Sequence, residues 1–209
     1  MKKYFSLLYK QLFHFLVSIS CYLNLPIFCA YLIKVSLFKP KLFRKKTKSK
    51  KIFIVLYREI GIRDIEIIHK SANSNFEFLF LRRSITKVIL FCFSNRKKFF
   101  FNYLNHPVFV EDYFNQNLNN KNNHNKFWIE VVFNLKKYFN NKTLNFITFN
   151  FDYYAEAALY VGCNKNKIAV KLWHKEGIQT DLDGEYRMKT TMPKMRHMFK
   201  YFTDISLGN

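Results

Sequence analysis

The sequence predicts an α/β protein with a Rossmann-like parallel sheet flanked by helices, preceded by N-terminal amphipathic or membrane-associated helices. Five short runs are almost continuously apolar, as in strands that are buried on both faces, and segments with helical spacing separate them. Such an alternation of strands and helices is typical of a parallel sheet covered by helices. Glycine and proline are scarce, at five and four residues, which argues against a β-sandwich of small residues.

The expected strands are residues 51–57, 76–81, 87–93, 144–149 and 167–173. Residues 126–139 have the apolar spacing of a helix, and residues 152–160 are predicted to form another, which Gly162 ends as its C-terminal cap. The asparagine-rich residues 115–125 have the composition of a polar, mobile loop in which His124 is exposed to solvent.

The first 51 residues differ in charge from the rest of the 209-residue chain. They hold eleven Lys, one Arg and no acidic residue, so they carry 12 of the 21 net positive charges. We therefore divide the chain into an apolar helical segment (1–38), a basic linker (39–51) and a Rossmann-like α/β domain (52–209).

The apolar segment has a polar stripe on one side. Lys3, Lys10, His14 and Ser18 share that side, and Pro26 favours a break before a second short helix at 27–38. Three interpretations remain open for the uncharged residues 11–33: helices that lie in a membrane interface or pack as a pair, a single membrane span, or a cleaved signal peptide. The first two put the rest of the chain at the cytoplasmic face of the inner membrane, as a peripheral or single-pass protein.

A net charge of +21 indicates an anionic partner. Only eight of the 35 basic residues are Arg, the residue best suited to reading bases and clamping phosphates. We therefore expect an anionic membrane surface as partner, and no specific nucleic acid. The four cysteines lack the spacing of metal ligands, so we expect buried, reduced thiols and neither a metal nor a cofactor.

Polar segments follow two of the predicted strands. Residues 150–156 follow the strand at 144–149, and residues 174–177 follow the strand at 167–173. In an open parallel sheet, ligands bind beyond the carboxyl ends of the strands. If these two strands are neighbours, both segments open on the same edge, and His174 and Glu176 lie near Asp152 and Tyr154. The negative charge of Asp152 also suits the positive end of the helix that follows it.

These two segments carry a resemblance to a known family. "NFDYYAEAALYVGCNKNKIAVKLWHKEGIQT", residues 150–180, resembles bacterial glycosyltransferases of the two-Rossmann-domain (GT-B-like) type that act in surface and capsule polysaccharide biosynthesis. In that family a segment of the form N-F-x-Y-x-A-E precedes a helix, and an H-K-E-[GC] turn follows the next strand. The matching positions are Asn150, Phe151, Tyr153 or Tyr154, Ala155 and Glu156, and then His174, Lys175, Glu176 and Gly177.

The resemblance implies transfer of a sugar from a nucleotide donor to a glycan acceptor. It makes His174 and Glu176 the candidate catalytic bases and implies a substrate-binding role for Asn150, Asp152, Tyr154, Glu156 and Lys175. The alternative is a purely structural turn that caps the following helix.

Such transferases also have a second Rossmann domain for the sugar nucleotide, and this sequence has no Gly-rich phosphate loop. We therefore expect an acceptor-side, incomplete or partner-dependent form that is inactive by itself. The rival functions are a non-catalytic membrane scaffold and a Lys-rich nucleic-acid binder.

Overall fold

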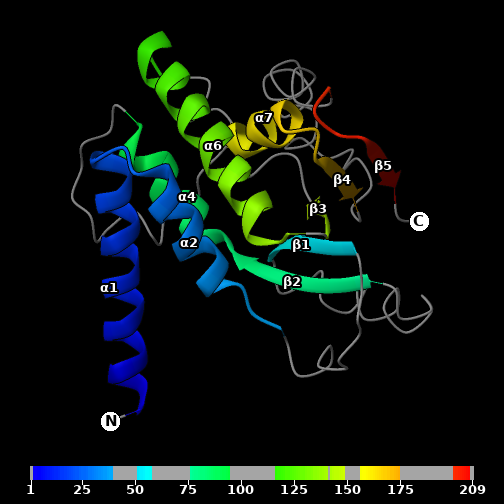
Figure 1. Ribbon diagram of the computed structural model, residues 1–209. Coiled ribbons are helices and arrows are strands. Elements are labelled where there is room, and N and C mark those ends of the chain that lie inside the picture. Colours follow the sequence, from blue (N-terminus) through cyan, green and yellow to red (C-terminus); the bar gives the residue numbers. More distant parts are fainter. Residues whose placement is uncertain are drawn as a thin grey trace, which may run out of the picture.

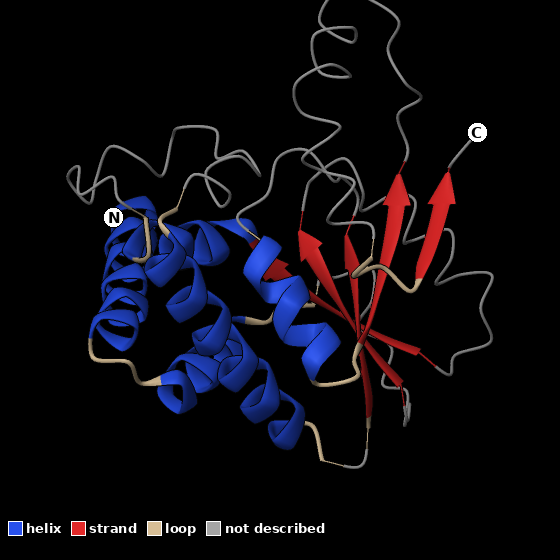
Figure 2. Cartoon of the chain, turned by 90° about the horizontal axis from the view of Figure 1, so that it is seen from above, coloured by secondary structure: helices blue, strands red, loops and turns tan. Residues whose placement is uncertain are grey.

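A computed structural model describes residues 2–39, 51–57, 76–94, 116–140, 142–148, 156–174 and 200–207. Five parallel strands form one sheet in the order β2-β1-β3-β4-β5. The strands are β1 (Lys51–Tyr57), β2 (Phe76–Arg82), β3 (Thr143–Thr148), β4 (Ala169–His174) and β5 (Asp204–Leu207). The predicted α/β class with a Rossmann-like parallel sheet is confirmed, and the described helices lie on one side of the sheet (Figures 1 and 2).

Side chains of the strands alternate between two apolar clusters. Ile52, Ile54 and Phe146 join the main core beneath the helices, whereas Val55 and Ile147 belong to a smaller cluster with Phe78 and Phe80. Successive side chains of a strand point to opposite faces of its sheet, so the central strands are apolar on both faces. This burial explains why four of the predicted strands appear as unbroken apolar runs.

The prediction of a strand at 87–93 was wrong. These residues belong to helix α4 (Arg83–Cys92), whose buried residues include Ile85, Val88 and Ile89 at helical spacing. On one side α4 packs against α1 (Lys2–Tyr22), and on the other it contacts β2. A short helix that is covered on two sides has apolar residues in succession, and such a run does not distinguish it from a buried strand.

The prediction of a loop at 115–125 was wrong for most of its length. Helix α6 (Leu118–Tyr138) begins within it, and the side chain of Asn117 caps the helix by accepting a hydrogen bond from the backbone N–H of Asn120 at 2.8 Å. His124 is fully buried instead of solvated. The indole Nε1 of Trp128 donates to His124 Nε2 at 3.1 Å, and the imidazole stacks on Phe93 of the neighbouring segment.

Gly162 lies inside helix α7 (Ala157–Lys165) instead of capping it. Helices α6 and α7 pack so closely that a Cβ on Gly162 would lie 2.7 Å from the backbone oxygen of Trp128. The helix ends with Asn166 at its C-cap, followed by Lys167 with a φ of 55°. Gly162 is therefore needed for the close approach of two helices, which a sequence pattern does not reveal.

Two helices form the N-terminal segment, as expected from the break at Pro26. Helix α2 (Pro26–Ser36) begins at that proline and packs mainly against α6, and α1 packs against α4 (Figure 1). Among the helices that the structure describes, none combines the length and the apolar character needed to cross a membrane. All four cysteines are free thiols, and Cys21, Cys29 and Cys163 are buried.

Candidate functional site

The site lies at the carboxyl edge of the sheet, where the strand order reverses. Strand β1 has β2 on one side and β3 on the other, so the chain runs outward in two directions from this pair. In open α/β sheets, the carboxyl ends of the strands at such a reversal border the ligand-binding crevice. Arg82 ends β2, Thr148 ends β3 and His174 ends β4, all at this edge.

Glu156 is the central described residue of the site. It is the N-cap of α7, the helix that follows β3, and its side chain is fully buried. Its Oε1 accepts hydrogen bonds from Arg83 Nε at 3.2 Å and from Thr86 Oγ1 at 3.1 Å, and both partners lie in the first turn of α4. Glu156 thus connects the helix after β3 to the helix after β2, across the carboxyl end of β1.

The second carboxylate oxygen of Glu156 is buried and has no hydrogen-bond partner in the part of the chain that the structure describes. Burial raises the pKa of this carboxyl group, while the charge of Arg83 and the hydrogen bonds from Arg83 and Thr86 lower it less strongly. An acid whose pKa is raised by burial beside a specific charge partner is typical of functional sites.

The surroundings of Glu156 are polar on both sides. One turn along α7, the hydroxyl of buried Tyr160 donates to Thr148 Oγ1 at 3.1 Å, at the end of β3. Burial raises the pKa of Tyr160 well above its usual value, and the charge of Glu156 raises it further. Burial also lowers the pKa of Lys87, one turn along α4 from Arg83. The arrangement places a carboxylate, a guanidinium, an amine and the three hydroxyls of Thr86, Thr148 and Tyr160 at one edge of the sheet.

Arg83 reaches the surface, as the partly buried Lys87 also does: its side chain is 21% exposed, whereas that of Glu156 is 0% exposed. The pair can therefore act as a unit in which Glu156 fixes the guanidinium and Arg83 contacts a ligand. A planar guanidinium suits carboxylate, phosphate and paired hydroxyl groups, because it presents several donors in a fixed geometry.

The structure brings together only some of the predicted site residues. Strands β3 and β4 are adjacent and parallel, with Thr148 paired to Leu172, so the two motif segments leave the sheet at the same edge. Glu156 lies in the site, and the backbone of His174 ends β4. The other predicted residues lie outside the described residues: Asn150, Asp152, Tyr154, Lys175 and Glu176.

The sequence analysis missed four residues of the site, namely Arg83, Thr86, Thr148 and Tyr160. Arg83 follows directly after β2, at a carboxyl end where ligand-binding residues are expected. The strand wrongly predicted at 87–93 hid this position, because it turned residues 82–86 into a connection between two strands. The pair of arginines at 82–83, in a chain with only eight, was the available signal.

The chain was also compared with known proteins. No protein-family model, curated protein or solved structure matches it. Among the described residues, no group of three or more His, Cys, Asp or Glu side chains is placed to hold a metal ion. Its function must therefore be inferred from the edge described above.

Proposed function

We propose that the chain is a glycosyltransferase-like, acceptor-side domain of surface polysaccharide biosynthesis, located at the cytoplasmic face of the inner membrane. One observation carries the proposal: β3 and β4 are neighbouring parallel strands. The two segments that resemble the transferase family therefore begin at one edge, although residues 157–173 separate them in the chain. This is the geometry that a shared binding crevice requires.

Within this proposal, Arg83 contacts the glycan acceptor and Glu156 holds its guanidinium in place. The ion pair is 3.2 Å long and one partner is fully buried, so the guanidinium keeps a defined direction. His174 and Glu176 remain the proposed bases that remove the proton of the acceptor hydroxyl, and Lys175 the proposed partner of a donor phosphate. The nucleotide sugar itself is assigned to a separate donor-binding domain.

Ligand binding tests this proposal without requiring turnover. The full chain is titrated with neutral and anionic oligosaccharides and with UDP-, GDP- and CMP-linked sugars, and binding is followed by calorimetry. We expect an oligosaccharide to bind. The substitution Arg83→Lys should lower the affinity for it by about tenfold, because a lysine does not reproduce the hydrogen bonds of a guanidinium. Arg82→Lys is the matched control, since Arg82 is exposed and its guanidinium lies over the Phe38 ring.

Two results would contradict the proposal. Either no oligosaccharide binds, or Arg83→Lys binds the oligosaccharide with the same affinity as Arg82→Lys and the wild-type chain. A membrane scaffold without catalysis is the second candidate function, because apolar side chains cover the outside of α1 and α2. A scaffold is expected to bind membranes and to ignore every sugar ligand.

A further inference from the structure

Helix α1 exposes large apolar side chains to solvent. The exposed fractions are 66% for Tyr9, 55% for Leu12, 53% for Phe15 and 69% for Tyr22, at spacings of one helical turn or two. The opposite side, which packs against α4, buries His14, Ser18 and Ser20 together with the core residues Val17 and Cys21. A helix on the surface of a water-soluble domain normally exposes polar side chains instead.

The polar side chains that α1 buries have hydrogen-bond partners or are uncharged. The hydroxyls of Ser18 and Ser20 donate to backbone oxygens of their own helix, at 3.0 Å and 2.6 Å. His14 Nε2 lies 3.1 Å from Ser84 Oγ of α4. Burial, followed by the charges of Lys10 and Arg82, lowers the pKa of His14 to about 4, so the imidazole is neutral at pH 7. The orientation of α1 thus satisfies both serine hydroxyls, while His14 Nδ1 is buried without a hydrogen-bond partner among the described residues.

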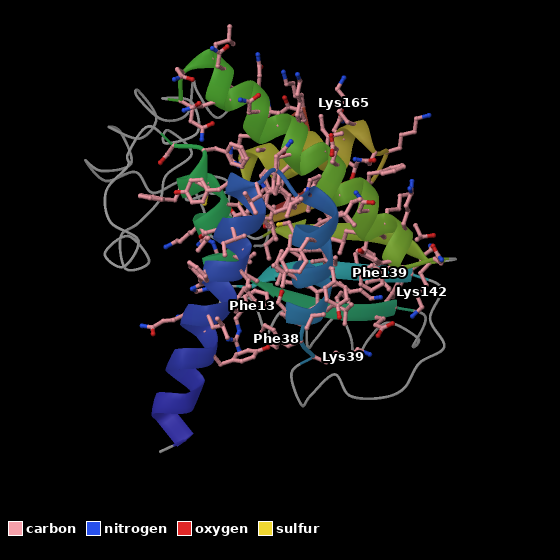
Figure 3. All side chains as sticks on the ribbon, turned by 60° about the vertical axis from the view of Figure 1, so that its left-hand side comes forward. Phe13, Phe38, Lys39, Phe139, Lys142 and Lys165 are labelled. Carbon is pink, nitrogen blue, oxygen red and sulfur yellow. The ribbon has the colours of Figure 1, made fainter. Side chains whose placement is uncertain are left out.

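The exposed apolar side chains continue onto α2. We define the outer face as Tyr9, Leu12, Phe15, Tyr22, Leu23, Ile27, Phe28, Tyr31 and Val35, all of which are exposed. Helices α1, α2 and α6 lie side by side in both views (Figures 1 and 3). Contiguous apolar patches of this kind on a protein surface mark sites of interaction with proteins or membranes.

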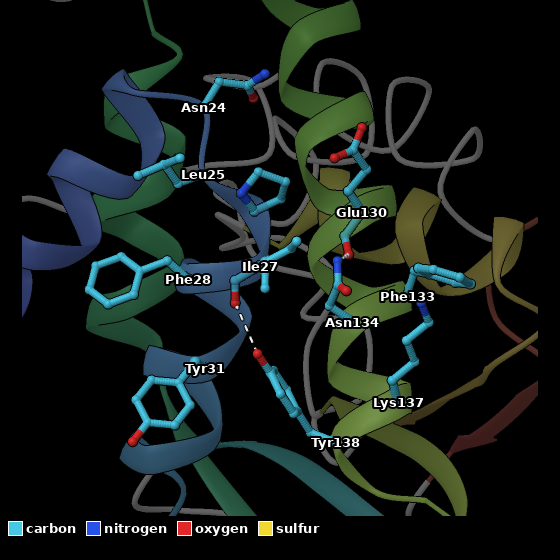
Figure 4. A pocket seen from close by; sticks show the side chains of 11 residues that line it. Asn24, Leu25, Ile27, Phe28, Tyr31, Glu130, Phe133, Asn134, Lys137 and Tyr138 are labelled. Atoms are coloured by element: carbon cyan, nitrogen blue, oxygen red, sulfur yellow. Dashed lines mark hydrogen bonds between the residues drawn. The ribbon is translucent and has the colours of Figure 1, made fainter.

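A groove of about 750 Å³ between α2 and α6 adjoins this face (Figure 4). Ile27, Phe28 and Tyr31 line it from α2, and Phe133 and Tyr138 line it from α6. The hydroxyl of Tyr138 donates to the backbone oxygen of Ile27 at 3.4 Å, which ties the two walls together. The groove is therefore mainly apolar and open to the outside, and Glu130, Asn134 and Lys137 of α6 add one negative, one amide and one positive side chain to its lining (Figure 4).

Charge indicates what covers this surface. Residues 2–39 contain five lysines and no acidic residue, and the exposed Lys10 and Lys34 flank the apolar side chains. Lysines with long apolar stems, and tyrosines such as Tyr9, Tyr22 and Tyr31, are typical of the boundary between lipid and water. An anionic bilayer matches both the apolar side chains and the positive charge.

We propose that the outer face, together with the groove between α2 and α6, docks on the surface of an anionic lipid bilayer. Helices α1 and α2 then lie in the plane of the interface, with their apolar side chains in the lipid. This contact is separate from the sugar site: Arg83→Lys should bind vesicles like the wild-type chain, and variants of the outer face should still bind oligosaccharides.

Vesicle sedimentation of the full chain tests the proposal, with phosphatidylcholine vesicles that contain either no anionic lipid or about 30% phosphatidylglycerol. We expect the wild-type chain to prefer the anionic vesicles. The triple variant Leu12→Gln, Phe15→Gln, Ile27→Gln should bind them at least about tenfold more weakly, since it removes three apolar side chains from the contact. Leu118→Gln is the control: Leu118 is 73% exposed in the first turn of α6, at the end far from the groove.

A second measurement does not depend on weakening the contact. Tryptophan introduced as Phe15→Trp should shift its emission to shorter wavelength with anionic vesicles and be quenched by brominated lipid, whereas Leu118→Trp should not respond. Equal vesicle binding by the triple variant, or no vesicle binding by the wild-type chain, would overturn the proposal. A third result would also overturn it: the wild-type chain is a dimer, the triple variant is a monomer, and lipid changes neither. A second copy of the chain would then cover the outer face.

Discussion

Protonation of His124 is expected to destabilise the folded protein, because this histidine is buried in its neutral form. Trp128 Nε1 can only donate, so His124 Nε2 must accept and Nδ1 must carry the proton. The side chain of Gln116 lies 3.4 Å from Nδ1. An imidazolium would lose the bond from Trp128 and would place a charge among Phe93, Phe127 and other core residues.

The size of this effect follows from the pKa. Burial lowers the pKa of His124 from 6.5 to about 3. Below pH 6.5 the unfolded chain therefore binds a proton that the folded chain does not, and the free energy of unfolding falls as the pH is lowered toward 3. At about pH 4.5, two units below the unfolded value, His124 alone should have cost about 3 kcal/mol of stability.

Urea unfolding at about pH 7.5 and about pH 4.5, followed by circular dichroism, measures this loss. The comparison is with His124→Gln, which keeps an acceptor for Trp128 but does not titrate. The variant should be less stable at neutral pH, and its stability should depend on pH less steeply by about 3 kcal/mol over this interval. His14, whose pKa is about 4, acts in the same direction in both proteins and so cancels from the difference. An identical pH dependence in the two proteins would refute the reasoning.

Three further predictions concern the helices and the site. Gly162→Ala should lower the unfolding free energy by about 1–2 kcal/mol, because the clash with the Trp128 backbone exceeds the gain in helix propensity of about 1 kcal/mol; a higher melting temperature would contradict this. Arg83→Met should destabilise by about 3 kcal/mol by leaving the buried Glu156 without its counter-charge, and a double variant with Glu156→Gln should recover most of the loss. Glu156→Gln alone should be at least as stable as the wild-type chain at neutral pH. The reason is that the pKa of Glu156 is raised in the folded protein, so its ionisation lowers the free energy of unfolding as the pH rises above about 4.5. A urea titration at neutral pH in which Glu156→Gln is clearly less stable than the wild-type chain would count against this prediction.

The sheet could be predicted because its strands are buried on both faces. Residues 51–57 form β1 with the predicted bounds, and the bounds of the other three correctly predicted strands differ by at most two residues at either end. Strand β5 was not predicted, since it is only four residues long and contains Asp204 and Ser206. An edge strand is short and need not be apolar.

The failures share a physical cause, which is packing between elements that are distant in the chain. The run 87–93 is apolar because α1 and the sheet cover α4 on two sides, and His124 is buried because Phe93 and Trp128 enclose it. Neither α1 nor Phe93 can be identified as a partner from local spacing, although Trp128 lies one turn from His124 on the same helix. The same limit applied to the site: the motif pointed to Glu156, but its partners Arg83 and Thr86 lie 73 and 70 residues away.

The polar stripe on α1 was recognised in the sequence, but its direction was not. Periodicity defines two sides of a helix without showing which of them faces the protein. Only the packing of α1 on α4 shows that His14 and Ser18 face inward and that Leu12 faces outward.

Hydrogen–deuterium exchange of the full chain with a saturating oligosaccharide tests the central claim most directly. If the carboxyl edge between β1 and β3 binds the acceptor, exchange should slow in the first turn of α4 (83–86) and at the start of α7 (156–160), and should be unchanged in α2 and in the second half of α6. Protection confined to α2 and α6, with no change around Arg83 and Glu156, would contradict the account.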